Sequence, residues 1–498
     1  MSESGSTANR WLRLSVVLTP LLAVSIGPVF GTGLVDDSYI FARYADHLVA
    51  GEGAVFNPGE RVEGYTSPAH LVLTAAGVLS GLEPIDATLA ISLLALCMLP
   101  LVLGFGLPGR MGPLSAWLTA AFVPLGVWGW TGMDAPLFAL AIAVVVVVFQ
   151  RARRRIWVAG AVAGCTVLVR PEGLVVILAA FCALLPQLRN ADARTRFGVV
   201  VSLLLPTLFM TGFRLAYYDA PLPNTFYAKV SGGGFDLWLR GARYLINGLV
   251  AAAPLVVLAA VGLARRLKGA EWPTPAMWIA AGLMGGIVVT GGDHFPLYRF
   301  VLPVVPVLAV VASQALSVDG PLRSLVLGGA TACVLLVTSW TAPSPLSEHD
   351  KSESTRMVDE VELATLWSHV GTSLRERLGE ERTVALIAVG AIPYQTGWRT
   401  IDMLGLTDRH IAQATSAGAG YVGHEKFDSS YVLEKKPEFI VLLPMVWPQP
   451  VPESVLLELV WGDANKDLMK HPKFGREYEL IWIESGRGVI GLHRRLAP

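Results

Sequence analysis

The sequence has little charge and lacks the common motifs for nucleotide or zinc binding. Only 16% of its 498 residues are charged and 53% are hydrophobic, and the mean hydropathy is +0.53. This composition is too apolar for an ordinary soluble globular protein. The 39 basic residues balance 39 acidic ones, so no net positive charge points to a nucleic-acid partner. The sequence has no P-loop, dinucleotide glycine fingerprint or zinc-ligand spacing, which leaves no recognisable nucleotide site.

Cysteine is also scarce. The four cysteines, Cys97, Cys165, Cys182 and Cys333, all fall inside apolar runs. No two of them have disulfide or metal-ligand spacing in a polar loop. They are therefore interpreted as small hydrophobic residues of membrane helices.

The sequence is instead rich in long apolar runs. About eleven runs are candidates for membrane spans: 11–30, 85–107, 113–131, 134–150, 156–169, 172–186, 197–218, 246–264, 276–291, 299–316 and 324–340. The first run is preceded by basic residues and followed by no small-residue cleavage site, so it predicts a retained anchor with a cytoplasmic N-terminus. Basic residues then fall in alternate loops only if the short stretch 67–84 lies on the outer membrane surface.

The composition changes after about residue 341. Residues 341–498 carry ordinary charge and no spanning run, and three short apolar segments (383–389, 439–443 and 479–483) are typical of strands. The sequence therefore predicts a transmembrane helical domain over 1–340 and a small extracytoplasmic α/β domain over 341–498.

The adjacent carboxylates Asp36 and Asp37 follow the first apolar run. Acidic side chains at the mouth of a membrane helix are costly to desolvate and tend to be kept for chemistry or ion binding. A carboxylate there can act as a general base or hold a divalent cation, the one cofactor that the pair suggests. The alternative is a helix cap or a solvated turn.

Other outer-face loops supply cations and polar groups. A lipid phosphate would need cationic partners at the interface. An arginine at the end of a span can also extend its guanidinium group to the aqueous interface without having a functional role. The candidate donor-binding residues are Arg43, Arg170, Glu172, Lys229 and Arg299, and the candidate substrate-binding residues are Tyr65, Asn224, Tyr227, Asp293 and His294. Asp293 and His294 are equally consistent with a buried or capping role.

Several of these segments together resemble a known family. They are residues 36–46, 53–66, 168–173, 221–229, 291–300, 400–410 and 423–426. The combination is similar to GT-C fold glycosyltransferases, and most similar to the terminal arabinofuranosyltransferases of mycobacterial cell walls. The resemblance implies a multi-pass enzyme of the bacterial inner membrane with its active site on the extracytoplasmic side.

The resemblance also implies a reaction. A sugar, D-arabinofuranose in the closest group, would pass from a polyprenyl-phosphate donor to a glycan or protein acceptor with inversion. Asp36 or Asp37 would be the catalytic base. Two other classes compete with this interpretation. A lipid or glycan transporter would place its charges near the bilayer midplane and show internal repeats, whereas a cell-wall-binding scaffold leaves the acidic loop unexplained.

Overall fold

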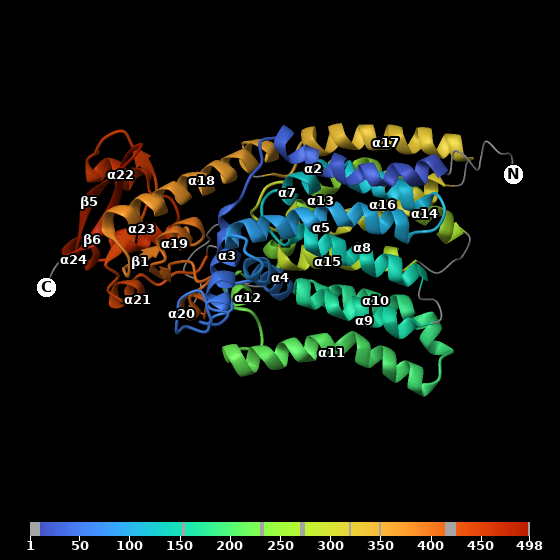
Figure 1. The fold of residues 1–498 in the computed structure, drawn as a ribbon, viewed down its shortest axis with the longest axis horizontal. Coiled ribbons are helices and arrows are strands. Elements are labelled where there is room, and N and C mark those ends of the chain that lie inside the picture. Colours follow the sequence, from blue (N-terminus) through green and yellow to red (C-terminus); the bar gives the residue numbers. More distant parts are fainter. Residues whose placement is uncertain are drawn as a thin grey trace.

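The computed structural model describes residues 10–151, 155–229, 234–268, 274–317, 320–347, 350–413 and 425–496. A bundle of long helices occupies one side of the molecule and a mixed α/β unit the other, with the chain termini at opposite ends (Figure 1). Two short helices, α3 and α4, lie where the bundle meets the α/β unit (Figure 1). Helix α18 runs from the bundle into that unit (Figure 1).

The bundle is built from the apolar runs. Its elements are η1 (Ser15–Leu18), α2 (Thr19–Val29), α3 (Asp36–Val49), α4 (Pro68–Leu79), α5 (Pro84–Gly106), α6 (Met111–Ala120), α7 (Val123–Gly129), α8 (Ala135–Arg151), α9 (Ile156–Val169), α10 (Gly173–Arg189), α11 (Ala193–Tyr218), α12 (Asn224–Lys229), α13 (Phe235–Ala251), α14 (Ala253–Lys268), α15 (Pro275–Thr290), η2 (Arg299–Val301), α16 (Val304–Leu316) and α17 (Pro321–Thr341).

Within the described ranges, four helices are long and apolar enough to cross a membrane, or up to six if each of two bent pairs forms one span. Six further apolar helices have 10–17 residues, so the expected number of about eleven spans stays a prediction. The expected spans 113–131 and 246–264 are broken, with bends of 69° between α6 and α7 and 95° between α13 and α14. Pro124 and Pro254 follow the two breaks, and proline removes a helical hydrogen-bond donor.

Helix α4 corresponds to the stretch expected on the membrane surface. It has 12 residues and is therefore roughly 18 Å long, too short for a hydrocarbon core of about 30 Å. Its side chains Val72 and Leu79 are exposed. A short apolar helix with an exposed apolar side fits an interfacial position.

The α/β unit follows the linker after α17. Its elements are α18 (Glu353–Leu378), β1 (Thr383–Leu386), α19 (Ala391–Thr396), β2 (Arg399–Asp402), α20 (Arg409–Gln413), α21 (Ser429–Glu434), β3 (Phe439–Val441), β4 (Val446–Trp447), α22 (Glu453–Leu459), α23 (Asp463–Lys470), α24 (Phe474–Glu477), β5 (Tyr478–Ser485) and β6 (Gly488–Arg495). The strands form one mixed sheet of order β2-β1-β3-β6-β4, with β5 paired to β6. All three strands expected from the sequence are present, and β2, β4 and β6 are additional.

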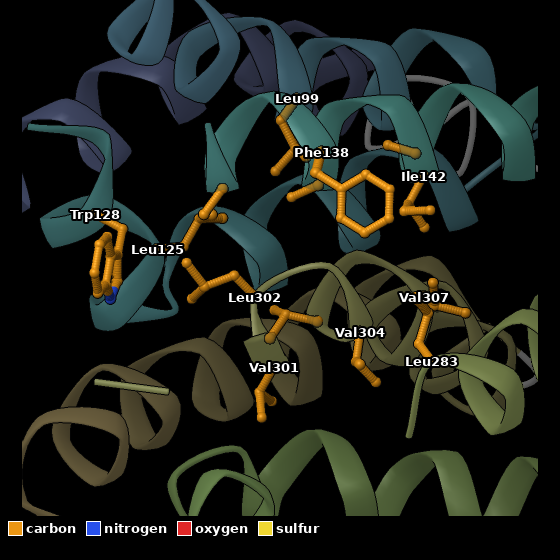
Figure 2. Packing of buried hydrophobic residues seen from close by; sticks show 14 of the residues in the cluster. Leu99, Leu125, Trp128, Phe138, Ile142, Leu283, Val301, Leu302, Val304 and Val307 are labelled. Atoms are coloured by element: carbon orange, nitrogen blue, oxygen red, sulfur yellow. The ribbon is translucent and has the colours of Figure 1, made fainter. Parts of the chain in front are cut away.

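Helix α3 joins two hydrophobic cores. Phe41 and Tyr44 belong to the bundle core, part of which is shown in Figure 2, where Phe138 of α8 lies opposite Val304 of α16. Tyr39 instead packs in the core of the α/β unit with Trp367 and Ile392. The first turn of α3, which carries the two carboxylates, is therefore held at the junction.

Candidate active site

The two carboxylates at the start of α3 have different surroundings. The carboxylate of Asp36 accepts hydrogen bonds from the backbone N–H groups of Gly390 (2.9 Å) and Ala391 (2.7 Å) at the start of α19. Burial raises the pKa of Asp36 to about 7, although these two hydrogen bonds oppose the shift. The side chain of Asp37 makes no hydrogen bond or ion pair with any described residue. The pair thus combines one anchored carboxylate with one that is free to meet a substrate.

Arg43 also belongs to α3, and its side chain makes contacts at the same junction between the bundle and the α/β unit. Its Nε donates to the carbonyl of Phe56 (2.8 Å) and its Nη2 to that of Trp398 (2.7 Å), while Nη1 donates to Pro393. Burial lowers the pKa of Arg43 to about 10. Because every guanidinium nitrogen is occupied by a backbone carbonyl, the arrangement ties α3 to the α/β unit, and the predicted donor-binding role of Arg43 stays a prediction.

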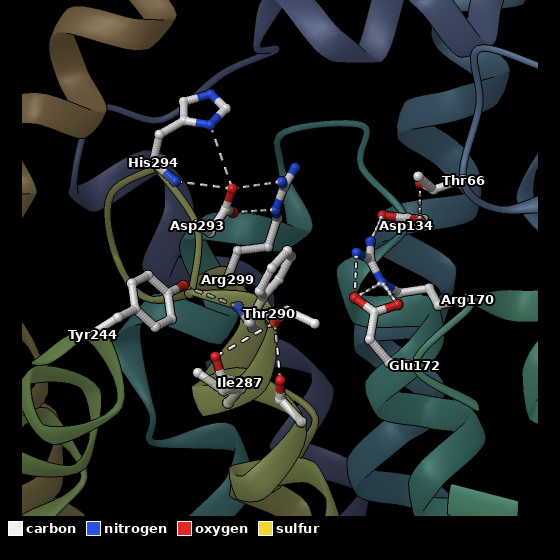
Figure 3. Close-up of polar contacts among 12 residues, drawn as sticks. Thr66, Asp134, Arg170, Glu172, Tyr244, Ile287, Thr290, Asp293, His294 and Arg299 are labelled. Atoms are coloured by element: carbon white, nitrogen blue, oxygen red, sulfur yellow. Dashed lines mark hydrogen bonds and ion pairs between the residues drawn. The ribbon is translucent and has the colours of Figure 1, made fainter. Parts of the chain in front are cut away.

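Arg170 lies at the break between α9 and α10. It forms an ion pair with Asp134 (2.7 Å) and a second with Glu172 (2.8 Å), as Figure 3 shows. Thr66 of the first outer loop bonds the other oxygen of Asp134 (3.4 Å). Gly173 makes the break possible, since a Cβ there would lie 2.6 Å from Cα of Val167. Arg170 is thus compensated by two carboxylates.

The loop after α15 holds a second buried pair. Arg299 contacts both carboxylate oxygens of Asp293, at 2.7 and 3.0 Å, and the backbone N–H of His294 donates to the same carboxylate (Figure 3). Burial alone would raise the pKa of Asp293, but Arg299, His294 and Lys229 together lower it below its usual value. The backbone at Tyr298 is left-handed (φ 54°), which turns the chain sharply into η2.

Phe300 connects the two arginines. The guanidinium carbons of Arg170 and Arg299 lie 5.3 and 5.4 Å from the centre of its ring, close enough for cation–π attraction. Both arginines line one end of a mainly apolar pocket between α8, α10 and α15, whose other lining residues include Phe138, Val175, Leu283 and Ile287. A charged mouth above an apolar pocket suits an amphiphile with an anionic head.

Lys229 ends α12 near this mouth. It forms no ion pair with a described residue, yet its positive charge helps to lower the pKa of Asp293. The two cations that line the pocket, Arg170 and Arg299, are paired with carboxylates. Lys229 is therefore the cation with charge to spare for a ligand.

The remaining predicted residues lie at the junction. Asn224 donates to the carbonyls of Gly405 (2.7 Å) and Leu406 (3.0 Å) in the α/β unit. The hydroxyl of Tyr65 bonds that of Tyr218 (2.9 Å), and Tyr227 is half-buried beside Asn224. These bonds hold the first outer loop and α12 in place, and the predicted contacts of Tyr65, Asn224 and Tyr227 with substrate stay predictions.

Sequence reasoning missed Glu360 of α18. Burial raises its pKa to about 7, and the negative charge of Asp37 adds to the shift. A single acid in a polar helix has no sequence signal that links it to a loop some three hundred residues away.

Among the described residues, no group of three or more metal-ligating side chains gathers into a metal site. The candidate segment 423–426 is described only from residue 425 onward, so Gly423 and His424 lie outside the described residues.

Known proteins share features of both sequence and fold. Residues 355–490 match a family model described as a domain of unknown function (DUF8728). The chain is 32% identical over 256 residues to the terminal beta-(1->2)-arabinofuranosyltransferase of Mycobacterium tuberculosis, an alignment that covers 46% of this chain and 40% of the relative. The chain thus matches less than half the length of that curated relative.

Two crystal structures of ArnT from Cupriavidus metallidurans share the fold. The apo structure has a TM-score of 0.59 at 14% identity and covers 98% of both chains. The structure bound to undecaprenyl phosphate has a TM-score of 0.56 at 13% identity and covers 97% of this chain and 98% of ArnT. The expected resemblance is confirmed: the chain has the GT-C fold of ArnT, and half of its sequence is similar to a mycobacterial arabinofuranosyltransferase.

Proposed function

We propose that this protein is a membrane glycosyltransferase that moves D-arabinofuranose from a polyprenyl-phosphate donor to an extracytoplasmic glycan or protein, with inversion. The observation that carries the proposal is the mainly apolar pocket whose lining includes Arg170 and Arg299. The sequence similarity to an arabinofuranosyltransferase supports the sugar. The fold shared with ArnT, which binds undecaprenyl phosphate, supports the donor class.

The charges at the mouth of the pocket support a phosphate site there. Arg170 and Arg299 are each held by carboxylates, so they supply hydrogen-bond donors with little net charge. Lys229 adds the unpaired positive charge that a phosphate requires. In the reaction these groups stabilise the negative charge that develops on the departing phosphate.

Asp37 is the proposed base. As the acceptor oxygen attacks the anomeric carbon, its proton passes to the Asp37 carboxylate, the bond from the anomeric carbon to the phosphate oxygen breaks, and polyprenyl phosphate leaves. Asp36 is assigned a positioning role, because both of its oxygens already accept backbone N–H groups of the α/β unit. In-line attack on the face opposite the phosphate inverts the configuration.

The proposed location follows from charge. Basic residues such as Arg110, Arg151 and Arg265 lie at one end of the bundle helices and are placed in the cytoplasm by the positive-inside rule. The carboxylates and the α/β unit then face the extracytoplasmic side of the bacterial inner membrane, where a lipid-linked sugar is available without a nucleotide.

The test uses the full-length protein in nanodiscs with radiolabelled decaprenyl-phosphoryl arabinofuranose and a short arabinan or peptide acceptor. Asp37→Asn is expected to lower transfer by at least about a hundredfold, as the loss of a general base does, without lowering thermal stability. Asp36→Asn is expected to lower stability as well as activity. Asp46→Asn is the matched control, since Asp46 is exposed on the same helix.

The possible outcomes test the roles of the two carboxylates separately from the identity of the sugar. If Asp37→Asn keeps full activity while Asp36→Asn is inactive and equally stable, the roles of the two carboxylates are reversed. If the wild-type protein transfers no sugar from this donor but accepts another polyprenyl-phosphate sugar, the arabinose assignment is wrong and the reaction class stands.

A further inference from the structure

The first turns of α18 are fastened to the loop that carries Asp293. The carboxylate of Glu353 accepts the backbone N–H of Leu297 (2.9 Å). Arg356 donates to the carbonyl of His294 (2.6 Å) and also pairs with Glu353 (3.0 Å). Met357 is buried in the bundle core. The start of this helix, although it leads into the α/β unit, is therefore a wall of the candidate active site.

The same stretch of α18 also packs on the chain just before α3. A Cβ on Gly33 would lie 2.9 Å from Cγ1 of Val361, and Gly33 precedes Asp36 by three residues. Glu360 follows Arg356 by four positions and so shares its side of the helix. Its side chain therefore lies between the Asp293 loop and the two carboxylates of α3.

The charges around Glu360 come from three elements. Asp36 and Asp37 face it from α3, Asp293 from the loop after α15, and Arg356 from its own helix. Two effects raise the pKa of Glu360 to about 7: burial, which is the larger, and the negative charge of Asp37. The positive charge of Arg356 opposes the shift. The side chain of Glu360 makes no hydrogen bond or ion pair with any residue in the described part of the chain. Its proton can therefore be lost or gained near neutral pH without breaking a structural contact.

We propose that Glu360 is a positioning residue of the transfer reaction, which acts through Asp37 and the donor phosphate. Because Glu360 lies near Asp37, a proton on Glu360 removes one of the like charges that would otherwise face the donor phosphate. A neutral Glu360 also admits the donor phosphate beside Asp293, whereas an ionised Glu360 repels it. This role rests on the proposed function, and it assigns part of the active site to the α/β unit.

The first test measures phosphate binding without transfer. The affinity of the full-length protein for undecaprenyl phosphate in nanodiscs is compared at pH 6 and pH 8.5 for wild type, Glu360→Gln and Glu362→Gln. Glu362 is exposed on the same helix and supplies the matched control. Wild type and the control are expected to lose about fivefold more affinity than Glu360→Gln as pH rises, because only they gain the repelling charge at position 360. Equal losses in all three would overturn the proposal.

The second test separates donor binding from turnover. Glu360→Gln is expected to lose the rise in donor KM that is predicted for wild type between pH 6 and pH 8.5. Glu360→Asp is expected to restore that rise, which a purely structural role would not predict. Transfer by wild type with a variant indistinguishable from Glu362→Gln would refute the role of Glu360 and leave the proposed function standing. The predicted binding pattern without transfer from any polyprenyl-phosphate sugar would support control of phosphate binding by Glu360, and it would refute the proposed function together with any part of Glu360 in transfer.

Discussion

The junction between α3 and α19 can be tested by one added methyl group. A Cβ on Gly390 would lie 2.5 Å from Cγ of Asp36 and closer still to the backbone oxygen of that residue. The chain at Gly390 must therefore retreat in Gly390→Ala, and the hydrogen bonds from Gly390 and Ala391 to the Asp36 carboxylate are lost. A hydrogen bond to a charged group contributes about 1.5 to 3 kcal/mol. Because the pKa of Asp36 is about 7, the carboxylate is only partly ionised at neutral pH, and the lower figure applies to each bond.

The expected loss is thus about 3 kcal/mol, or roughly a hundredfold increase in local opening of α19. Other junction contacts, such as those from Arg43 to Trp398 and from Asn224 to Gly405, keep the α/β unit attached. Hydrogen exchange of the peptide covering residues 387–396 measures the opening directly. Gly475→Ala is the control, since a Cβ at Gly475 meets nothing within 4 Å. Equal exchange rates in the two variants would refute the close packing of Asp36 on α19.

Three further changes probe the site and its support. Arg214→Ala is expected to lower thermal stability by about 3 to 5 kcal/mol, because it leaves Glu63, which Arg214 contacts at 2.7 Å, buried without a partner; an Arg214→Met/Glu63→Leu double variant as unstable as the single one would contradict this. Arg299→Lys keeps the charge but loses the two-pronged contact with Asp293, so binding of undecaprenyl phosphate should weaken about tenfold or more, and unchanged affinity would remove Arg299 from the donor site. Burial raises the pKa of Asp402 to about 6, above the unfolded value, so its contribution to stability is present below about pH 4 and lost as pH rises through 6. In denaturant unfolding, wild type should therefore lose stability relative to Asp402→Asn over that interval, and a pH-independent difference would contradict the shift.

The elements that local pattern determines could be predicted from the sequence. The run 383–389 is apolar and rich in strand formers, and it contains β1. The spans containing Pro124 and Pro254 could have been recognised as broken, since a proline inside an apolar run is a known cause of a bend. Strand β6 was missed because Gly491, His493 and the terminal arginines interrupt its apolar pattern, and only its pairing with β3, β4 and β5 defines it.

For the candidate site too, the sequence reveals local patterns but not the contacts that form when the helices pack. Its loops could be located, because carboxylates and arginines beside membrane helices are rare enough to stand out. Their partners could not, since Asp134 meets Arg170 and Glu360 lies near Asp37 only after the helices have packed. The pattern also could not distinguish Asp36 from Asp37. That distinction comes from α19, a short helix whose contact with α3 spans more than three hundred residues of sequence.

The position of α3 couples the α/β unit to the proposed active site. Tyr39 of α3 is packed in the core of the α/β unit, while Phe41, two residues later, is packed in the bundle core. A shift of one unit relative to the other therefore cannot leave the first turn of α3 unchanged, because packed cores resist deformation. The same shift would move Glu360, whose helix is fastened to the Asp293 loop by Arg356. In the proposed reaction, a movement of the α/β unit would thus be transmitted both to the proposed base and to the proposed phosphate site.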